Sequence, residues 1–330
     1  MEEKGVRRCR ISNVGGIPMH FVVVGAGAVG GYFGGKLARA GASVTFLVRE
    51  RRFKQLAERG LRIHSVHGNF TCNPSLALRA DAIVDPTVII LAVKNYHLPS
   101  TLPQLTDLVQ KGAKILPLLN GVKHIDRLIE AFGKDAMLGG SCYVEATLNS
   151  EGDILQTSPM QDVVFGPLGV MDRSLLTQIE LWFERAKIPV RLSAHIMVDM
   201  WTKYLFLVTL SAITTATRLP VGPIRDDPIT YAFLRELVSE AFAIAKQCEP
   251  GLSDDVPDTM LTRLASVTPA MTSSMHRDLE KGLPLELDDL QGALIALGRE
   301  RGLDAPHFEA IYALLHPFKE GKKDAKESAV

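Results

Sequence analysis

The chain has 330 residues, of which 46% are hydrophobic and 22% charged, so it can bury one or two domain cores and is neither disordered nor fibrous. Lysine plus arginine and aspartate plus glutamate each total 37, and this balance excludes a net field that attracts nucleic acid or an anionic membrane. The four cysteines are far apart and lack zinc-ligand spacing, which indicates a reduced, cytoplasmic protein without a metal site.

The two ends of the chain are polar and are expected to lie outside the folded domains. Residues 1–18 lack the apolar run of a signal peptide and are interpreted as a loose extension. Residues 321–330 are charged and without apolar periodicity, which is typical of a frayed tail. Between them the pattern changes once, so we expect a domain over 19–193 and a second domain over 194–320.

Residues 19–193 alternate short apolar runs with helical stretches, as a parallel sheet covered by helices requires. We expect strands at 20–25, 43–48, 88–93 and 114–119, a hairpin at a mixed edge within 61–78, short strands at 153–157, 162–166 and 188–192, and helices at 28–40 and 174–187. This order predicts an α/β Rossmann domain with a doubly wound, mostly parallel sheet.

Residues 194–320 show only helical patterns and predict an all-α domain. The helices are expected at 195–217, 230–247, 258–267, 273–281, 285–301 and 306–318. Residues 200–217 carry Lys203 as their only charge but are interrupted by hydroxyl side chains, which favours a buried helix over a membrane span. A largely apolar helical domain also favours a homodimer.

Three glycines, Gly25, Gly27 and Gly30, follow the first strand at GxGxxG spacing and open a helix. The first permits a tight turn, the second lets a pyrophosphate approach the backbone, and the third lets helix and strand pack closely. With Ala26, Ala28 and Val29 they are expected to hold a dinucleotide at the amides of the helix start. A purely structural glycine turn is the alternative.

The second strand ends at Arg49-Glu50-Arg51-Arg52, where an enzyme specific for NAD usually has an acid for the ribose hydroxyls. A basic end fits the 2′-phosphate of NADP, so we expect NADPH as the cofactor and Arg49 as the phosphate contact. The competing interpretation takes Glu50 as the ribose acid, shifted by one position.

Lys94 and Asn120 end two further strands and should therefore face the cofactor crevice. A lysine in a surface loop and an ordinary Asn-Gly turn are the alternatives. Lys203 must face a cleft or a partner, because a buried unpaired ammonium is costly, unless it reaches solvent along the helix surface. Ser274 and Glu286 stand at the starts of two successive helices, where a polar residue and an acid are also favoured for structural reasons alone.

Taken together, these residues resemble the ketopantoate reductase (2-dehydropantoate 2-reductase) family over about residues 19–318. The motifs that carry the resemblance are GAGAVG at 25–30, AVK at 92–94, LNG at 119–121, WTK at 201–203 and SSMHRDLEKGLPLELDDLQGALIALGRERGLDAP from 273. The resemblance implies a Rossmann domain and a helical domain with the active site between them. The implied reaction is reduction of a 2-oxo acid to a 2-hydroxy acid by NADPH.

The resemblance also implies roles for individual residues. Lys203 would be the catalytic acid and Glu286 a catalytic group that orients it. The implied substrate contacts are Asn120, Ser274 and Ser211, and the implied NADPH contacts beyond the glycine turn are Arg49, Lys94 and Asn120.

One departure concerns the substrate. Family members commonly carry asparagines four and eight residues after the lysine, where this chain has Leu207 and Ser211. The expected substrate is therefore 2-dehydropantoate or a related, more apolar 2-oxo acid. Two alternatives stay open, namely another Rossmann-plus-helical dehydrogenase of hydroxy-acid or opine type, and a non-catalytic NADP-binding sensor.

Overall fold

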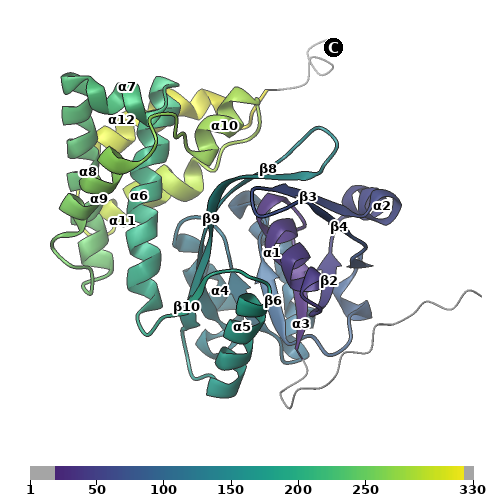
Figure 1. Cartoon of the computed structure of the whole chain (residues 1–330). Coiled ribbons are helices and arrows are strands. Elements are labelled where there is room, and N and C mark those ends of the chain that lie inside the picture. Colours follow the sequence, from purple (N-terminus) through teal and green to yellow (C-terminus); the bar gives the residue numbers. More distant parts are fainter. Residues whose placement is uncertain (1–18, 323–330) are drawn as a thin grey trace, which may run out of the picture.

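The computed structural model describes residues 19–322, which form a sheet-containing part and a helical part side by side (Figure 1). The extension expected at 1–18 lies outside the described residues, as does most of the expected tail, 323–330. The first two tail positions are tied to the helical part, since the amide of Lys322 donates to the carbonyl of Gly282 at 2.9 Å.

A parallel sheet forms the centre of the N-terminal part, as the apolar runs predict. Its order is β5 (Ser75–Ala77), β2 (Ser43–Leu47), β1 (His20–Val24), β6 (Val88–Leu91) and β7 (Lys114–Pro117), and every pair is parallel. The helices of this part are α1 (Ala28–Arg39), α2 (Glu50–Arg59), α3 (Leu98–Gln110), α4 (Lys123–Phe132) and α5 (Arg173–Arg185). Central strand residues such as Val22 and Ile89 are fully buried, because helices cover both faces.

A second sheet corrects the expectation for the remaining strands. The hairpin of β3 (Leu61–Ser65) and β4 (Phe70–Cys72) forms as predicted, but it pairs with β9 (Ile154–Pro167) and not with the edge of the parallel sheet. The two runs predicted at 153–157 and 162–166 are one strand, β9, interrupted in its pairing where Pro159 removes a ladder donor.

The strand β8 (Leu138–Leu148) is absent from the sequence prediction, because its Gly139-Gly140 start is untypical of a strand. It pairs antiparallel with β9, and β10 (Val190–Leu192) completes this sheet. The long β8–β9 hairpin lies beside the helical part in Figure 1. This hairpin is therefore the surface of the N-terminal part that faces α6 (Ile196–Thr217).

The C-terminal part is helical, as predicted, but it includes a short helix over residues 221–226 that the sequence did not predict, and one predicted helix begins differently. Besides α6 it contains α7 (Val221–Asp226), α8 (Pro228–Cys248), α9 (Val256–Ser266), α10 (Ser274–Glu280), α11 (Ala293–Arg299) and α12 (Pro306–Leu315). The helix expected from 285 begins instead with a π-helical turn at Asp288–Gly292. The preceding residues 283–286 have no regular secondary structure, and the amide of Leu285 donates to the carbonyl of Lys319 at 2.9 Å.

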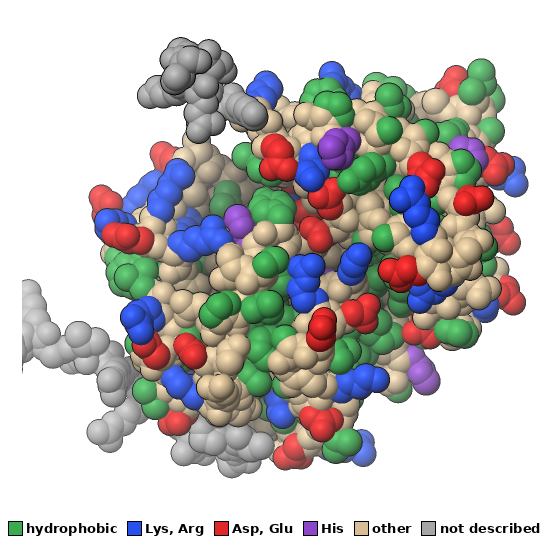
Figure 2. Space-filling model, turned by 180° about the vertical axis from the view of Figure 1, so that it is seen from behind, with side chains coloured by type: hydrophobic (Ala, Val, Ile, Leu, Met, Phe, Trp, Pro, Cys, Tyr) green, Lys and Arg blue, Asp and Glu red, His purple; other side chains and the backbone are tan. Residues whose placement is uncertain are grey.

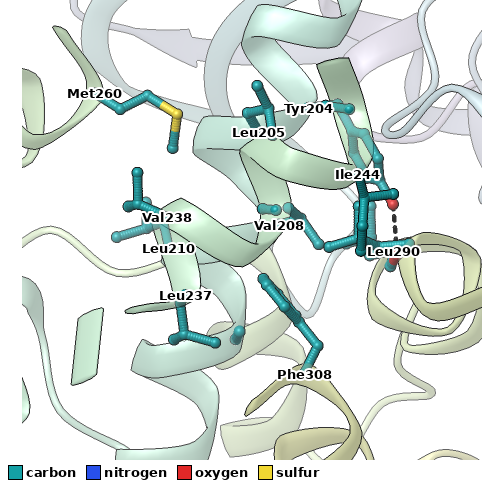
Figure 3. Packing of buried hydrophobic residues seen from close by; sticks show 14 of the residues in the cluster. Tyr204, Leu205, Val208, Leu210, Leu237, Val238, Ile244, Met260, Leu290 and Phe308 are labelled. Atoms are coloured by element: carbon teal, nitrogen blue, oxygen red, sulfur yellow. Dashed lines mark hydrogen bonds between the residues drawn. The ribbon is translucent and has the colours of Figure 1, made fainter. Parts of the chain in front are cut away.

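The helix α6 is the centre of the helical core. Figure 3 shows Leu205 and Val208 of α6 among apolar side chains that include Val238 and Phe308, all of them at most 1% exposed. By length and composition α6 is the one described helix that could cross a membrane, yet most of it is buried inside the protein. The prediction of a buried helix is confirmed.

The bond between Tyr204 and Leu290 ties α6 to the π-helical turn (Figure 3). The Tyr204 hydroxyl donates to the Leu290 carbonyl at 2.6 Å, and both residues are 1% exposed. Tyr204→Phe should lower the free energy of unfolding by about 1 kcal/mol, because a buried hydrogen bond is lost while the Leu290 carbonyl keeps the backbone amide of Ala293 as a donor. Denaturant unfolding measures this. Tyr312→Phe, which removes a bond from an exposed hydroxyl to Asp288, is the control; an equal loss in both variants would contradict the explanation.

Candidate functional site

The glycine-rich turn has the shape that a pyrophosphate requires. Gly25 has a φ of +99°, and a Cβ there would lie 2.7 Å from the carbonyl oxygen of Ala92. A Cβ on Gly30 would lie 2.1 Å from the Gly25 carbonyl, so this glycine lets α1 approach β1, whereas the space above Gly27 is open to 4 Å. The start of α1 has no side-chain cap and no acid in its first turn. Its free amides therefore fit a dinucleotide phosphate.

Two arginines flank this turn. Arg49 precedes α2, is exposed, and its Nη2 lies 3.4 Å from the hydroxyl of Ser100. Arg52, which sequence analysis did not single out, donates from Nε to the carbonyl of Ala26 at 3.0 Å, and its buried Nη2 has no partner among residues 19–322. Glu50, the competing ribose acid, instead pairs with Lys54 at 2.7 Å on the exposed side of α2.

Lys94 and Glu286 meet each other, which the sequence did not predict. The Nζ of Lys94 lies 2.9 Å from Asp278 and 3.0 Å from Glu286, and Glu286 is only 4% exposed. The side-chain amide of Asn95 donates to Glu286 at 3.3 Å and to the carbonyl of Asn120 at 2.9 Å. Burial disfavours the charged lysine, but the two carboxylates outweigh it and raise the pKa of Lys94. Glu286 thus orients Lys94, and no described contact joins it to Lys203.

Lys203 faces a small cleft with about 200 Å³ of empty space. The cleft is lined by Leu119, Gly121, Gly140, Ser141, Met200, Lys203, Tyr204 and Leu207. The ammonium lies 5.5 Å from the centre of the Tyr143 ring, and within the described chain it has neither a hydrogen bond nor an ion pair. Lys203 is therefore a free hydrogen-bond donor in a cleft with apolar walls.

The predicted substrate residues divide into two groups. The side chains of Asn120, beside Gly121, and of Ser274 make no hydrogen bond within residues 19–322 and are partly exposed. Ser274 lies one turn before Asp278 on α10, so the bond of Asp278 to Lys94 places it near the cofactor crevice.

Ser211 does not line the cleft in this structure, so the geometry gives no support to its expected substrate contact. It is fully buried, donates to the carbonyl of Val208 at 3.2 Å and accepts from Gln291 at 2.8 Å. Leu207, one turn earlier on α6, does line the cleft. The side of α6 that carries Leu207 therefore faces the cleft, whereas Ser211 lies on the side that faces the helical core.

Other parts of the described surface do not bring the predicted site residues together. A larger hollow near β5, with about 890 Å³ of empty space, is lined by residues such as His20 and Phe53 and contains none of the predicted site residues. Among the described residues no three histidine, cysteine, aspartate or glutamate side chains lie close enough to hold a metal ion. Figure 2 shows acidic and basic side chains interspersed over one face, in keeping with their equal totals.

Comparisons with known proteins cover both parts of the chain. Residues 21–169 match the family model described as ketopantoate reductase PanE/ApbA, and residues 195–320 match its C-terminal model. The oxidoreductase YkpB of Bacillus subtilis strain 168 is 36% identical over 92% of this chain and 100% of its own length.

Solved structures agree with this match. A PanE/ApbA family ketopantoate reductase from Ralstonia eutropha JMP134 has a TM-score of 0.82 at 26% identity, covering 91% of this chain and 98% of its own. D-mandelate dehydrogenase, solved with NADH and anilino(oxo)acetate, has a TM-score of 0.83 with the same two coverages. At 21% identity this second likeness concerns the fold alone.

His124 on α4 gives a test of the electrostatics around Lys203. Burial, and then the charge of Lys203, lower the pKa of His124 to about 3, and neither ring nitrogen has a partner within the described residues. An unfolded histidine titrates near 6.5, so between these values the unfolded state binds one more proton and stability is lost as pH falls.

We expect His124→Leu to reduce the slope of unfolding free energy against pH by up to about 1.4 kcal/mol per unit between pH 6 and 4. Denaturant unfolding at several pH values measures the slope. His195→Leu, at an exposed position, is the control and should keep the slope of the unmodified protein. An unchanged slope in His124→Leu would show that this imidazole is not buried uncharged.

Proposed function

The chain belongs to the ketopantoate reductase family, and from this premise we propose that it reduces a 2-oxo acid to a 2-hydroxy acid with NADPH. The observation that carries the proposal is the unpartnered ammonium of Lys203 in a cleft beside the Asn120-Gly121 turn. A buried lysine with only a structural role is normally paired with an acid, whereas Lys203, which is partly exposed, has no acidic partner among the described residues. A donor without a partner is instead suited to a ligand.

The proposed chemistry requires little from the protein beyond orientation and charge. NADPH, when bound, supplies the hydride. Lys203 donates a hydrogen bond to the ketone oxygen, stabilises the negative charge that develops there, and transfers its proton to give the alcohol. Asn120 has a free side chain next to the cleft and would hold the carboxylate or the carbonyl in place. The network of Glu286 and Lys94 would fix the loop on the cofactor side.

The geometry around the glycine turn supports a dinucleotide with a 2′-phosphate. Arg49 is exposed at the end of β2 and has no acidic partner within residues 19–322. The carboxylate of Glu50 forms an ion pair with Lys54. This pairing weakens the alternative in which Glu50 binds the ribose of NAD. We therefore propose NADPH over NADH, with Arg49 as the phosphate contact.

The substrate class follows from the cleft wall. Leu207 offers no hydrogen bond and Ser211 is turned into the core, so a hydroxyl on the substrate would find few partners there. We propose 2-dehydropantoate or a more apolar 2-oxo acid as the substrate. The apolar wall also favours a second candidate, an aromatic 2-oxo acid whose reduction gives an aromatic hydroxy acid of the kind that D-mandelate dehydrogenase, which shares the fold, is named for.

Cofactor choice is tested at Arg49. In the unmodified protein NADPH should bind at least ten-fold more tightly than NADH, which is about 1.4 kcal/mol. Arg49→Ala should remove most of this difference by weakening NADPH alone, as measured by calorimetric titration. Arg51→Ala, at an exposed neighbouring position, should preserve it. Equal affinities of the unmodified protein for both cofactors would refute the assignment.

Turnover is tested at Lys203 with a panel of 2-oxo acids that includes 2-dehydropantoate and aliphatic and aromatic analogues. Lys203→Ala should lower kcat by about 10² to 10⁴ and leave NADPH binding nearly intact, because only the proton donor is lost. The exposed Lys54→Ala is the control. If the unmodified protein binds NADPH but reduces no member of the panel, it is a sensor and not a reductase.

A further inference from the structure

The strand β8 presents a row of polar side chains to the helical part. Glu145 accepts a hydrogen bond at 3.1 Å and Thr147 one at 2.7 Å from side chains of the α10 segment. The ring of Tyr143 lies 5.5 Å from the ammonium of Lys203. Ser141 is two residues before Tyr143, on the regular part of β8 that precedes the irregularity between Val144 and Ala146, so its side chain lies on the same face as Tyr143, where it lines the cleft.

Ser141 differs from the rest of the row because its hydroxyl is unused. The residue is 2% exposed, and its Oγ has no hydrogen-bond partner among the described residues. Burial raises the pKa of the Tyr143 phenol, while the nearby Arg263 and the Ser141 hydroxyl act in the opposite direction. No hydrogen bond of normal geometry joins the two hydroxyls. A buried hydroxyl without a partner destabilises the fold, and alanine would avoid this cost.

The other described side chains that line the cleft cannot replace the Ser141 hydroxyl as a hydrogen-bond donor. Tyr204 donates its hydroxyl to the carbonyl of Leu290 at 2.6 Å, and Leu207 has no donor. Among the described side chains that line the cleft, Lys203 and Ser141 are therefore the two with free donors.

We propose that the Ser141 hydroxyl is a second hydrogen-bond donor to the ketone oxygen of the substrate, beside Lys203. This inference rests on the proposed function. As the carbonyl carbon gains a hydride from the reduced nicotinamide, which is oxidised, the π electron pair moves to the oxygen. Lys203 transfers a proton to that oxygen and later regains one from water, while Ser141 keeps its proton and donates throughout. Two donors from separate elements, β8 and α6, fix the carbonyl in one orientation.

The test compares Ser141→Ala with Ser158→Ala in the full chain with NADPH. Ser158 on β9 also has a buried hydroxyl without a partner, but it does not line the cleft. Ser141→Ala should lower kcat/KM for the best 2-oxo acid about 10- to 100-fold, and it should weaken binding of an N-substituted oxamate, whose amide carbonyl stands in for the ketone. Ser141→Thr, which keeps the hydroxyl, should restore most of both. Ser158→Ala should change neither.

Thermal unfolding without ligand provides the second readout. Ser141→Ala should have a Tm equal to or above that of the unmodified protein, because it removes an unsatisfied hydroxyl. Full activity in Ser141→Ala, or a loss of activity together with a lower Tm, would overturn the proposal and leave the proposed function intact. If the unmodified protein neither reduces a 2-oxo acid nor binds the oxamate, both proposals fail.

Discussion

The ion pair between Lys94 and Glu286 is the buried polar contact that ties the edge of the parallel sheet at the candidate site to the helical part. It joins the loop after β6 to the segment before the π-helical turn, 192 residues later in the chain. Removing Lys94 would leave Glu286 as a carboxylate that is 4% exposed with the amides of Asn95 as its partners. Breaking a buried pair in this way costs about 3–5 kcal/mol, and less here because the Lys94 side chain is 38% exposed.

The same network explains where the candidate site lies. Asn95 connects Glu286 to the carbonyl of Asn120, so the end of β7 is held against the helical part. The following Gly121 has a φ of +80°, and a Cβ there would lie 3.2 Å from the carbonyl of Asp289. A glycine is therefore needed where the turn approaches the π-helical segment. This close approach places the turn beside Lys203, which projects from α6 into the same cleft.

The sequence predicted local features well, because apolar runs, glycine spacing and a lone charge act over a few residues. The parallel strands, the glycine turn and the exposure of Lys203 to a cleft could all be predicted in this way. The strand β8 could not, since Gly139 and Gly140 are explained only by distant neighbours. A Cβ on Gly139 would lie 2.7 Å from Ile196 of α6, and one on Gly140 would lie 2.4 Å from the carbonyl of Pro117.

The partners of charged and polar side chains were harder to predict for the same reason. The family resemblance implied that Glu286 orients Lys203, whereas in the structure Glu286 pairs with Lys94, which had been expected only as a cofactor contact. The Ser211 hydroxyl was expected to contact the substrate. In the structure it accepts a hydrogen bond from Gln291, which is 80 residues away in the sequence.

Two of the buried polar side chains without a hydrogen-bond partner among the described residues, Ser141 and His124, lie close enough to Lys203 to share its cleft or respond to its charge. The Ser141 hydroxyl borders the cleft, and His124 senses the charge of Lys203 from its buried position. Each such group lowers stability in the free protein, so a fold selected for stability alone would replace it with an apolar residue.

The walls contributed by Leu119, Met200 and Leu207 exclude water once a ligand enters. In that drier environment a hydrogen bond from an ammonium or a hydroxyl is electrostatically stronger than in water. Under the proposed function, the free donors and the apolar walls are therefore two parts of one arrangement, in which stability is given up in the free protein for stronger interactions with a bound carbonyl.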